Sequence, residues 1–234
     1  DDSKDKKIMN NAKELFDDIE FGDLFDTVLL QTEGSYNGCG LTKRMAIQYV
    51  LDNTKIDYIF NSDDNSRIDS EVTIPNILRT LKTVDKVGYC GTIGNYTIYY
   101  RDFDEYSARF FTNMGTFYGL RRDMLEDIGN FDPKLEGRED VELGVRAWKA
   151  GYWVVAVWAP IKHKTYHGKD DIFEKNGELW TRCTKYVAEK HKGYVIATSN
   201  GQIRRTKKLS YPEVEIGFDE NMDFYVKELE DEDE

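Results

Sequence analysis

Strand-like and helix-like segments alternate along the chain from about residue 25 to residue 158, and this alternation most constrains the fold. Short apolar or β-branched runs predict strands at 25–31, 57–60, 87–90, 97–101, 114–120 and 152–158. Apolar residues recur at helical spacing in the intervening segments 41–53, 70–83, 122–128 and 139–150. This order favours the α/β class, with a mixed, mostly parallel sheet flanked by helices.

A single domain with a C-terminal extension accounts for the organisation of the chain. The 234 residues suffice for one sizeable core, and no internal repeat or linker interrupts them. Further helices are expected at 4–20 and after His167 to about His191. We therefore place the domain at 1–192 and an extended segment with an acidic end at 193–234.

The composition is that of a globular protein. Hydrophobic residues make up 40% of the chain and aromatic residues 13%, which excludes a disordered chain. No run of about 18 apolar residues predicts a transmembrane helix, and the charged start does not resemble a secretion signal. Cys39, Cys90 and Cys183 are too few and too widely spaced for a disulfide framework or a zinc site. A reducing, cytoplasmic location is therefore expected.

The net charge of −12 lies almost entirely at the C-terminal end. Residues 213–234 hold eleven acidic residues against Lys227 alone, so the remaining residues together carry a charge of −2. The body of the protein is thus almost neutral, and the overall charge does not exclude anionic partners. A short basic run, RRTKK at 204–208, precedes the acidic end.

A pair of carboxylates follows the predicted strand at 57–60. Asp63 and Asp64 lie in the polar run NSDDN at the carboxyl end of that strand, where open α/β sheets bind ligands. Adjacent carboxylates repel each other unless a cation or hydrogen-bond donors accept their charge. Oxygen ligands suit Mg²⁺ or Mn²⁺, so the pattern indicates a metal site. Turn and capping roles are the alternative, because Asp is common in both.

A second acidic pair, Glu139 and Asp140, opens the predicted helix at 139–150. One of the two could project into a cleft as a general base, because adjacent acids in different surroundings can have different pKa values. The structural alternative is that both acids simply interact favourably with the positive end of the helix dipole.

Two further segments could bind ligands. His163 and His167 follow the strand at 152–158, and His167 becomes a candidate ligand together with Asp64. The segment Thr42-Lys43-Arg44 opens a helix after a Gly-rich turn and could hold phosphate, with a solvated first turn as the alternative. The chain has no GxxxxGK[ST], GxGxxG or GxSxG motif, which disfavours P-loop kinases and GTPases.

In their order along the chain, these motifs resemble nucleotide-sugar glycosyltransferases of the GT-A fold, close in pattern to the inverting family 2 enzymes. The resemblance covers roughly residues 25–170 and is most specific in NMGTFYGLRRDMLEDIGNFDPKL and GREDVELGVRAWKAGY. It implies transfer of a sugar from a nucleotide-diphosphate sugar to an acceptor hydroxyl of a glycan or glycoconjugate. A UDP-sugar is the expected donor, and Mn²⁺ or Mg²⁺ is the expected cofactor.

The resemblance also implies roles for residues at matching positions. These roles are nucleotide binding for Glu33, Arg44 and Asp63, metal binding for Asp64 and His167, catalysis for Asp140 and Glu139, and lining of the donor-sugar pocket for Met114 and Gly115. In this scheme Asp140 is the catalytic base, and Glu139 meets the acceptor or orients the site.

Two other hypotheses stay open at this point. The compact size, the TKR helix and the GRED segment also resemble phage-type transferases that glycosylate hydroxymethylated pyrimidines in DNA, which the basic run at 204–208 permits. The non-enzyme alternative is a catalytically inactive GT-A binding module, because the apolar strand that normally begins this fold is missing before the helix at 4–20. The presence of Asp64, Asp140 and His167 together favours an enzyme.

Overall fold

The centre of the molecule is a four-stranded mixed sheet. The computed structural model describes residues 30, 39–63, 66–68, 70–92, 116–157, 161–163, 177–199, 203–206, 214–218 and 224–228. The strand order is β1-β4-β3-β5, with β1 at Tyr58–Ser62, β4 at Phe117–Arg121, β3 at Val87–Thr92 and β5 at Trp153–Val157. Strands β3 and β5 run parallel, whereas β4 pairs antiparallel with both β1 and β3.

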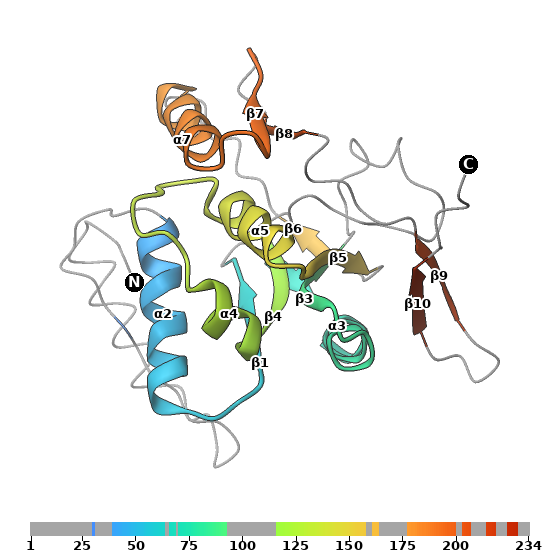
Figure 1. Ribbon diagram of the computed structural model, residues 1–234. Helices are drawn as coiled ribbons and strands as arrows, with labels where there is room; N and C mark the ends of the chain where they lie inside the picture. Colours follow the sequence, from blue (N-terminus) through green and yellow to red (C-terminus); the bar gives the residue numbers. More distant parts are fainter. Residues whose placement is uncertain are drawn as a thin grey trace, which may run out of the picture.

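Helices cover both faces of this sheet (Figure 1). Helix α3 (Ser70–Thr83) packs closely on one face, because Gly119 of β4 has no side chain and a Cβ there would meet Ile77 and Leu81. Helices α2 (Cys39–Asn53), α4 (Arg122–Ile128) and α5 (Glu139–Lys149) lie on the opposite side. There the ring of Tyr118, the residue before Gly119, lies 5.7 Å from Nζ of Lys43 in α2.

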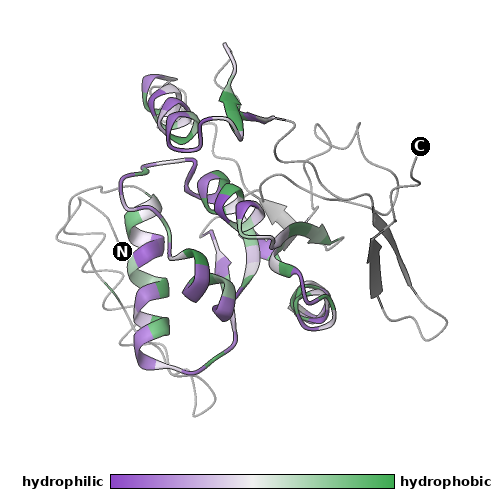
Figure 2. Cartoon of the chain, in the orientation of Figure 1, coloured by the Kyte–Doolittle hydropathy of each residue, from purple (hydrophilic) through white to green (hydrophobic). Residues whose placement is uncertain are grey.

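One hydrophobic core joins the strands to the inward faces of the helices. Ile77 of α3, Tyr89 of β3, Met124 of α4 and Val154 of β5 are all fully buried within it. Figure 2 shows hydrophilic and hydrophobic residues alternating around the helices, as expected for helices that bury one face. Burial of one apolar face on each helix is the main favourable term in holding such layers together.

The predicted helices that fall in the described residues are confirmed. The segments 41–53, 70–83, 122–128 and 139–150 correspond to α2, α3, α4 and α5. Two short strands, β2 (Ser66–Ile68) and β6 (Ile161–His163), were not predicted, and they pair antiparallel with each other. Neither has an alternating apolar pattern, and the partners lie far apart in the sequence, so no local signal indicates the pairing.

The α/β class and the mixed sheet are confirmed, but the balance of strand directions differs from the expectation of a mostly parallel sheet. In the described part of the central sheet, two of the three pairings are antiparallel. The reason is β4, which enters between β1 and β3 and runs against both. An apolar run predicts that a strand forms but carries no information about its direction.

Beyond the central layers, helix α7 (Gly177–Lys190) is followed by two hairpins. The first pairs β7 (Val195–Ala197) with β8 (Ile203–Arg205), and the second pairs β9 (Val214–Phe218) with β10 (Phe224–Glu228). These four strands lie in the segment expected to be extended.

Three further predictions concern other parts of the chain. The expected helix at 4–20 and the expected strands at 25–31, apart from Leu30, and at 97–101 lie outside the described residues. Across the part of the chain that the structure covers, no helix is both long enough and apolar enough to cross a membrane.

Candidate active site

The first functional side chain, Asp63, is positioned by the end of β1. Strand β1 pairs with β4 up to Ser62, and the N–H of Asp63 continues the ladder by donating to the carbonyl of Thr116 at 2.9 Å. Side chains alternate between the two faces of a strand, so Asp63 shares a face with Asn61, on the side of α2 and α5. The side chain of Asp63 is 34% exposed and can therefore meet a ligand.

The acidic pair lies at the N-terminal end of α5. Arg138 precedes this helix in the left-handed conformation, with φ of 65°, and α5 begins at Glu139. Glu139 is buried, whereas Asp140 is half-buried and accepts a hydrogen bond from the N–H of Val141 at 2.8 Å. Both acids thus lie where main-chain N–H groups and the helix dipole favour negative charge.

Lys43 of α2 connects the two acidic positions. Its ammonium donates to Oε1 of Glu139 at 2.7 Å and lies 3.9 Å from Oδ1 of Asp63. It also lies over the rings of Tyr118 and Phe131, at 5.7 and 6.0 Å from their centroids. The end of β1 and the start of α5 therefore form one cluster of charges.

A close approach of α2 to the loop before α5 makes this contact possible. The N–H of Gly40, in the first turn of α2, donates to the carbonyl of Leu135 at 2.9 Å. A Cβ at Gly40 would overlap the carbonyl oxygens of Asp132 and Leu135. Glycine at this position therefore lets the start of α2 lie against the loop, one turn before Lys43.

The surroundings raise the pKa values of both Asp140 and Lys43, which favours the neutral acid but the charged ammonium. Burial and the neighbouring charge of Glu139 raise the pKa of Asp140 to about 6, although Lys43 acts to lower it. Burial acts to lower the pKa of Lys43, but the negative charges of Glu139, Asp140 and Asp63, together with Tyr118, raise it well above its ordinary value. The cluster thus contains a lysine, Lys43, that stays protonated. Beside it lies a carboxylate, that of Asp140, whose pKa is near neutral, as a general base requires.

Three polar groups under the cluster lack partners. Among the described residues, the hydroxyls of Tyr89 and Tyr118 and Nδ2 of Asn61 are buried without a hydrogen bond. The two tyrosine rings lie 5.0 Å apart, and burial raises both hydroxyl pKa values, so both hydroxyls stay neutral. Unsatisfied buried polar groups are rare in folded proteins, and a bound ligand or water at this place would account for them.

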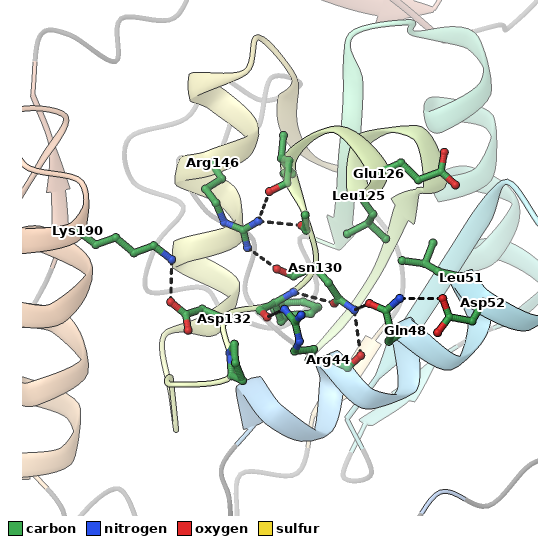
Figure 3. A pocket seen from close by; sticks show the side chains of 14 residues that line it. Arg44, Gln48, Leu51, Asp52, Leu125, Glu126, Asn130, Asp132, Arg146 and Lys190 are labelled. Atoms are coloured by element: carbon green, nitrogen blue, oxygen red, sulfur yellow. Dashed lines mark hydrogen bonds and ion pairs between the residues drawn. The ribbon is translucent and has the colours of Figure 1, made fainter.

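The structure brings together three of the predicted site residues and separates a fourth. Asp63, Glu139 and Asp140 lie in the cluster described above. Arg44 instead donates to the carbonyl of Phe131 at 3.1 Å and lines a separate pocket of about 670 Å³ (Figure 3). The remaining candidates lie outside the described residues and stay predictions: Glu33, Asp64, Met114, Gly115 and His167.

Lys43 is the residue that sequence reasoning did not single out. It was grouped with Thr42 and Arg44 as a possible phosphate-binding segment, and the resemblance favoured Arg44. A usable signal was nonetheless present: Lys43 precedes Ile47 by four residues, so both share the inward face of α2. A lysine on the buried face of a helix requires an anionic partner, and Glu139 is that partner.

A second network, centred on Glu142, fixes α5 against α7. Glu142 is fully buried and binds three basic side chains: Arg146 at 2.9 Å, Lys190 at 2.7 Å and His191 at 3.1 Å. Lys190 also binds Asp132 at 2.7 Å, and this contact is drawn in Figure 3. Nearer the acidic pair, the guanidinium of Arg138 stacks 3.7 Å from the ring centroid of Trp180 in α7.

The expected metal site stays a prediction. Within the described ranges, no group of three or more His, Cys, Asp and Glu side chains could hold a metal ion. The predicted ligands Asp64 and His167 lie outside those ranges. Asp63, however, presents a partly exposed carboxylate immediately before Asp64, and carboxylate oxygen is the ligand type that Mn²⁺ and Mg²⁺ take.

The fold is similar to that of two solved glycosyltransferase structures. The mannosyltransferase PcManGT from Pyrobaculum calidifontis, in complex with GDP-Man and Mn²⁺, has a TM-score of 0.53 and 14% identity, covering 80% of this chain and 51% of its own. Residues 1–349 of S. aureus TarS give 0.50 and 13% identity, covering 81% and 54%. No family model and no curated protein sequence matches the chain. The chain thus shares its fold with these two structures and spans about half their length.

Proposed function

We propose that the chain is a metal-dependent glycosyltransferase that transfers a sugar from a nucleotide-diphosphate sugar to an acceptor hydroxyl, with inversion. Asp140 is the proposed base, and a glycan or glycoconjugate is the proposed acceptor. One observation carries this proposal: Lys43 unites the carboxylate at the end of β1 with the acidic pair that opens α5. A donor held at the first position would thus be adjacent to a base at the second.

The local chemistry of Asp140 supports its role as the base. Its pKa of about 6 lets it be ionised at neutral pH and still accept a proton readily. In the proposed step, the acceptor hydroxyl gives its proton to Asp140 while its oxygen bonds to the anomeric carbon. The bond from that carbon to the diphosphate oxygen breaks, and the diphosphate leaves with the electron pair. Attack opposite the leaving group inverts the configuration.

The proposed binding groups follow the position of Asp63. We propose that Asp63 contacts the ribose, that Glu33 recognises the base, and that Asp64 and His167 hold the metal. A divalent cation bound there supplies positive charge to the leaving diphosphate. A UDP-sugar is our first choice of donor, and GDP-sugars belong in the same test because the PcManGT complex contains GDP-Man.

A donor panel tests the proposal. UDP- and GDP-sugars are incubated singly with the protein and Mn²⁺, and release of nucleoside diphosphate by slow donor hydrolysis is measured. We expect hydrolysis of one donor by the wild type and its loss in Asp64→Ala. Asp85→Ala is the matched control, because Asp85 is an exposed acid just before β3, and we expect it to keep wild-type activity.

The absence of both donor hydrolysis and nucleotide binding would contradict the proposal. If no donor is hydrolysed, and calorimetry detects no binding of UDP or GDP with Mn²⁺, the chain is not a nucleotide-sugar transferase. The inactive binding module would then be the better account of the fold.

A further inference from the structure

We propose that Lys43 is a positioning residue that gives the two adjacent acids of α5 different tasks: it holds Glu139 in an ion pair and leaves Asp140 to take the acceptor's proton. This inference rests on the proposed function and adds to it a role for Lys43 that neither the motifs nor the comparisons indicate. It also explains why a lysine lies on the inward face of α2.

The geometry of the ion pair is that of a fixed contact. The two atoms, Nζ of Lys43 and Oε1 of Glu139, are 2.7 Å apart, and the side chains are only 13% and 7% exposed. A charged hydrogen bond of this length in a water-poor site is strong, and removal of one partner leaves a buried charge without compensation. Lys43 therefore fixes both the charge and the orientation of Glu139.

The second acid is held differently. Asp140 accepts a hydrogen bond from the N–H of Val141 at 2.8 Å, and it is more exposed than Glu139. The helix start thus orients Asp140 while leaving its carboxylate able to bind a proton. Two adjacent carboxylates with such different contacts can serve different roles.

Lys43 also adjusts the affinity of Asp140 for protons. Burial and Glu139 raise the pKa of Asp140, whereas Lys43 and Arg138 lower it. Without Lys43, the charge of Glu139 would act on Asp140 with less compensation. The other titratable groups that interact with this cluster are Cys39 of α2, Asp63 after β1, Tyr89 of β3 and Tyr118 of β4.

The position of Lys43 links this pair to the donor side of the site. Its ammonium lies 3.9 Å from Oδ1 of Asp63, the residue proposed to contact the ribose. The rings of Tyr118 and Phe131 under the ammonium limit its other positions. Lys43 therefore sets the distance between the donor side and the base.

Four variants test the proposal in a turnover assay across pH: Lys43→Met, Lys43→Arg, Glu139→Gln and the double variant Lys43→Met/Glu139→Gln. We expect Lys43→Met to lower kcat by roughly tenfold to a hundredfold and to move the acid limb of the profile upward by about one pH unit. Donor KM should change by less than about threefold, because Lys43 donates its short hydrogen bond to Glu139 and lies farther from Asp63, at 3.9 Å.

The double variant distinguishes a positioning role of Lys43 from a loss of folded structure. Removal of Glu139 as well as Lys43 leaves no uncompensated charge, so its acid limb should return towards the wild-type position. Lys43→Arg should keep most of the activity because it keeps the cation. Lys55→Met is the control, since Lys55 is an exposed lysine after α2. An unmoved acid limb in Lys43→Met, or a raised donor KM with unchanged kcat, would overturn the inference.

A second measurement does not depend on turnover. The carboxyl ¹³C resonance of Asp140, assigned by its loss in Asp140→Asn, is titrated in the wild type and in Lys43→Met. We expect a higher midpoint in Lys43→Met, and an equal midpoint would refute the role of Lys43. This titration distinguishes the two proposals, because the shift is expected even if no donor is turned over, in which case only the proposed function fails.

Discussion

Burial and the charge of Glu139 outweigh the favourable contacts of the Asp140 carboxylate at the helix start, and this has a measurable effect on stability. Its pKa is raised from 3.8 to about 6 in the folded protein, so folding takes up a proton between these values. The ionised form therefore destabilises the fold at neutral pH, and this cost is absent below about pH 4. The proposed base is thus a source of instability.

Asp140→Asn is predicted to be more stable than the wild type at pH 7 by about 1–3 kcal/mol. The gain should shrink as the pH falls through about 6 and disappear near pH 4, because the wild-type carboxyl is then neutral too. Activity should fall by about two to four orders of magnitude, the usual contribution of a general base. Urea unfolding at several pH values measures the stability, and equal unfolding curves at pH 7 would contradict the prediction.

The pKa of Glu142 is shifted in the opposite direction to that of Asp140. Burial acts to raise its pKa, but His191, Arg146 and Lys190 together lower it from 4.5 to about 2. This group therefore contributes stability that is fully present above pH 4.5 and is lost as the pH falls towards 2.

Glu142→Gln is predicted to lower the free energy of unfolding by about 3–5 kcal/mol at pH 7, because it leaves the cations of Arg146 and Lys190 without this carboxylate. Its stability should also depend less on pH between 4.5 and 2 than that of the wild type. Glu178→Gln, an exposed change on α7, is the control. A loss at pH 7 no larger than that of the control would show that the network is not the anchor of α7.

At the residue scale, sequence reasoning found the acids more readily than their cation. Asp63, Glu139 and Asp140 carry local signals, since they follow a strand or open a helix. The choice between Lys43 and Arg44 depends on the rotation of α2 against its neighbours, and tertiary packing decides that rotation. Adjacent residues on a helix point about 100° apart. A role assigned to Arg44 instead of Lys43 therefore falls on a side chain with entirely different contacts.

Among the elements, α2 depends on its close contact with the loop before α5. Gly40→Ala is predicted to destabilise the protein by about 1–3 kcal/mol, because the new Cβ would overlap the carbonyls of Asp132 and Leu135 and push the helix away. The shift should also separate Lys43 from Glu139 and lower activity. Gly177→Ala is the control, since nothing lies within 4 Å of its Cβ position. Equal stabilities of the two variants would contradict the close approach.

The start of α5 carries a conformation that most residues avoid. Arg138 has a φ of 65°, which costs a residue with a side chain roughly 1 kcal/mol, and its stacking on Trp180 offsets that cost. Arg138→Gly is therefore predicted to be more stable than Arg138→Ala by about 1 kcal/mol, since both lose the stacking and only glycine relieves the backbone. Denaturant unfolding of the two variants checks this, and an alanine variant as stable as the glycine variant would refute it.

At the scale of the whole molecule, the central helices and strands in the described part of the chain were predictable, but the directions of the strands were not. Helical periodicity located α2, α3, α4 and α5 because each buries one apolar face. The antiparallel insertion of β4 and the β2–β6 pairing are long-range choices that leave no local pattern. The Glu142 network was also not predicted, because Arg146 of α5, Lys190 of α7 and His191 just after α7 come together only after folding.

The central claim is that the end of β1 and the start of α5 form one nucleotide-sugar site. A crystal structure of the protein with Mn²⁺ and the nucleoside diphosphate of the preferred donor tests this claim most directly, because anomalous scattering locates the manganese. We predict manganese beside Asp64 and a diphosphate next to the cluster of Asp63, Lys43 and Glu139. A nucleotide in the pocket lined by Arg44, or manganese bound away from Asp64, would contradict the account.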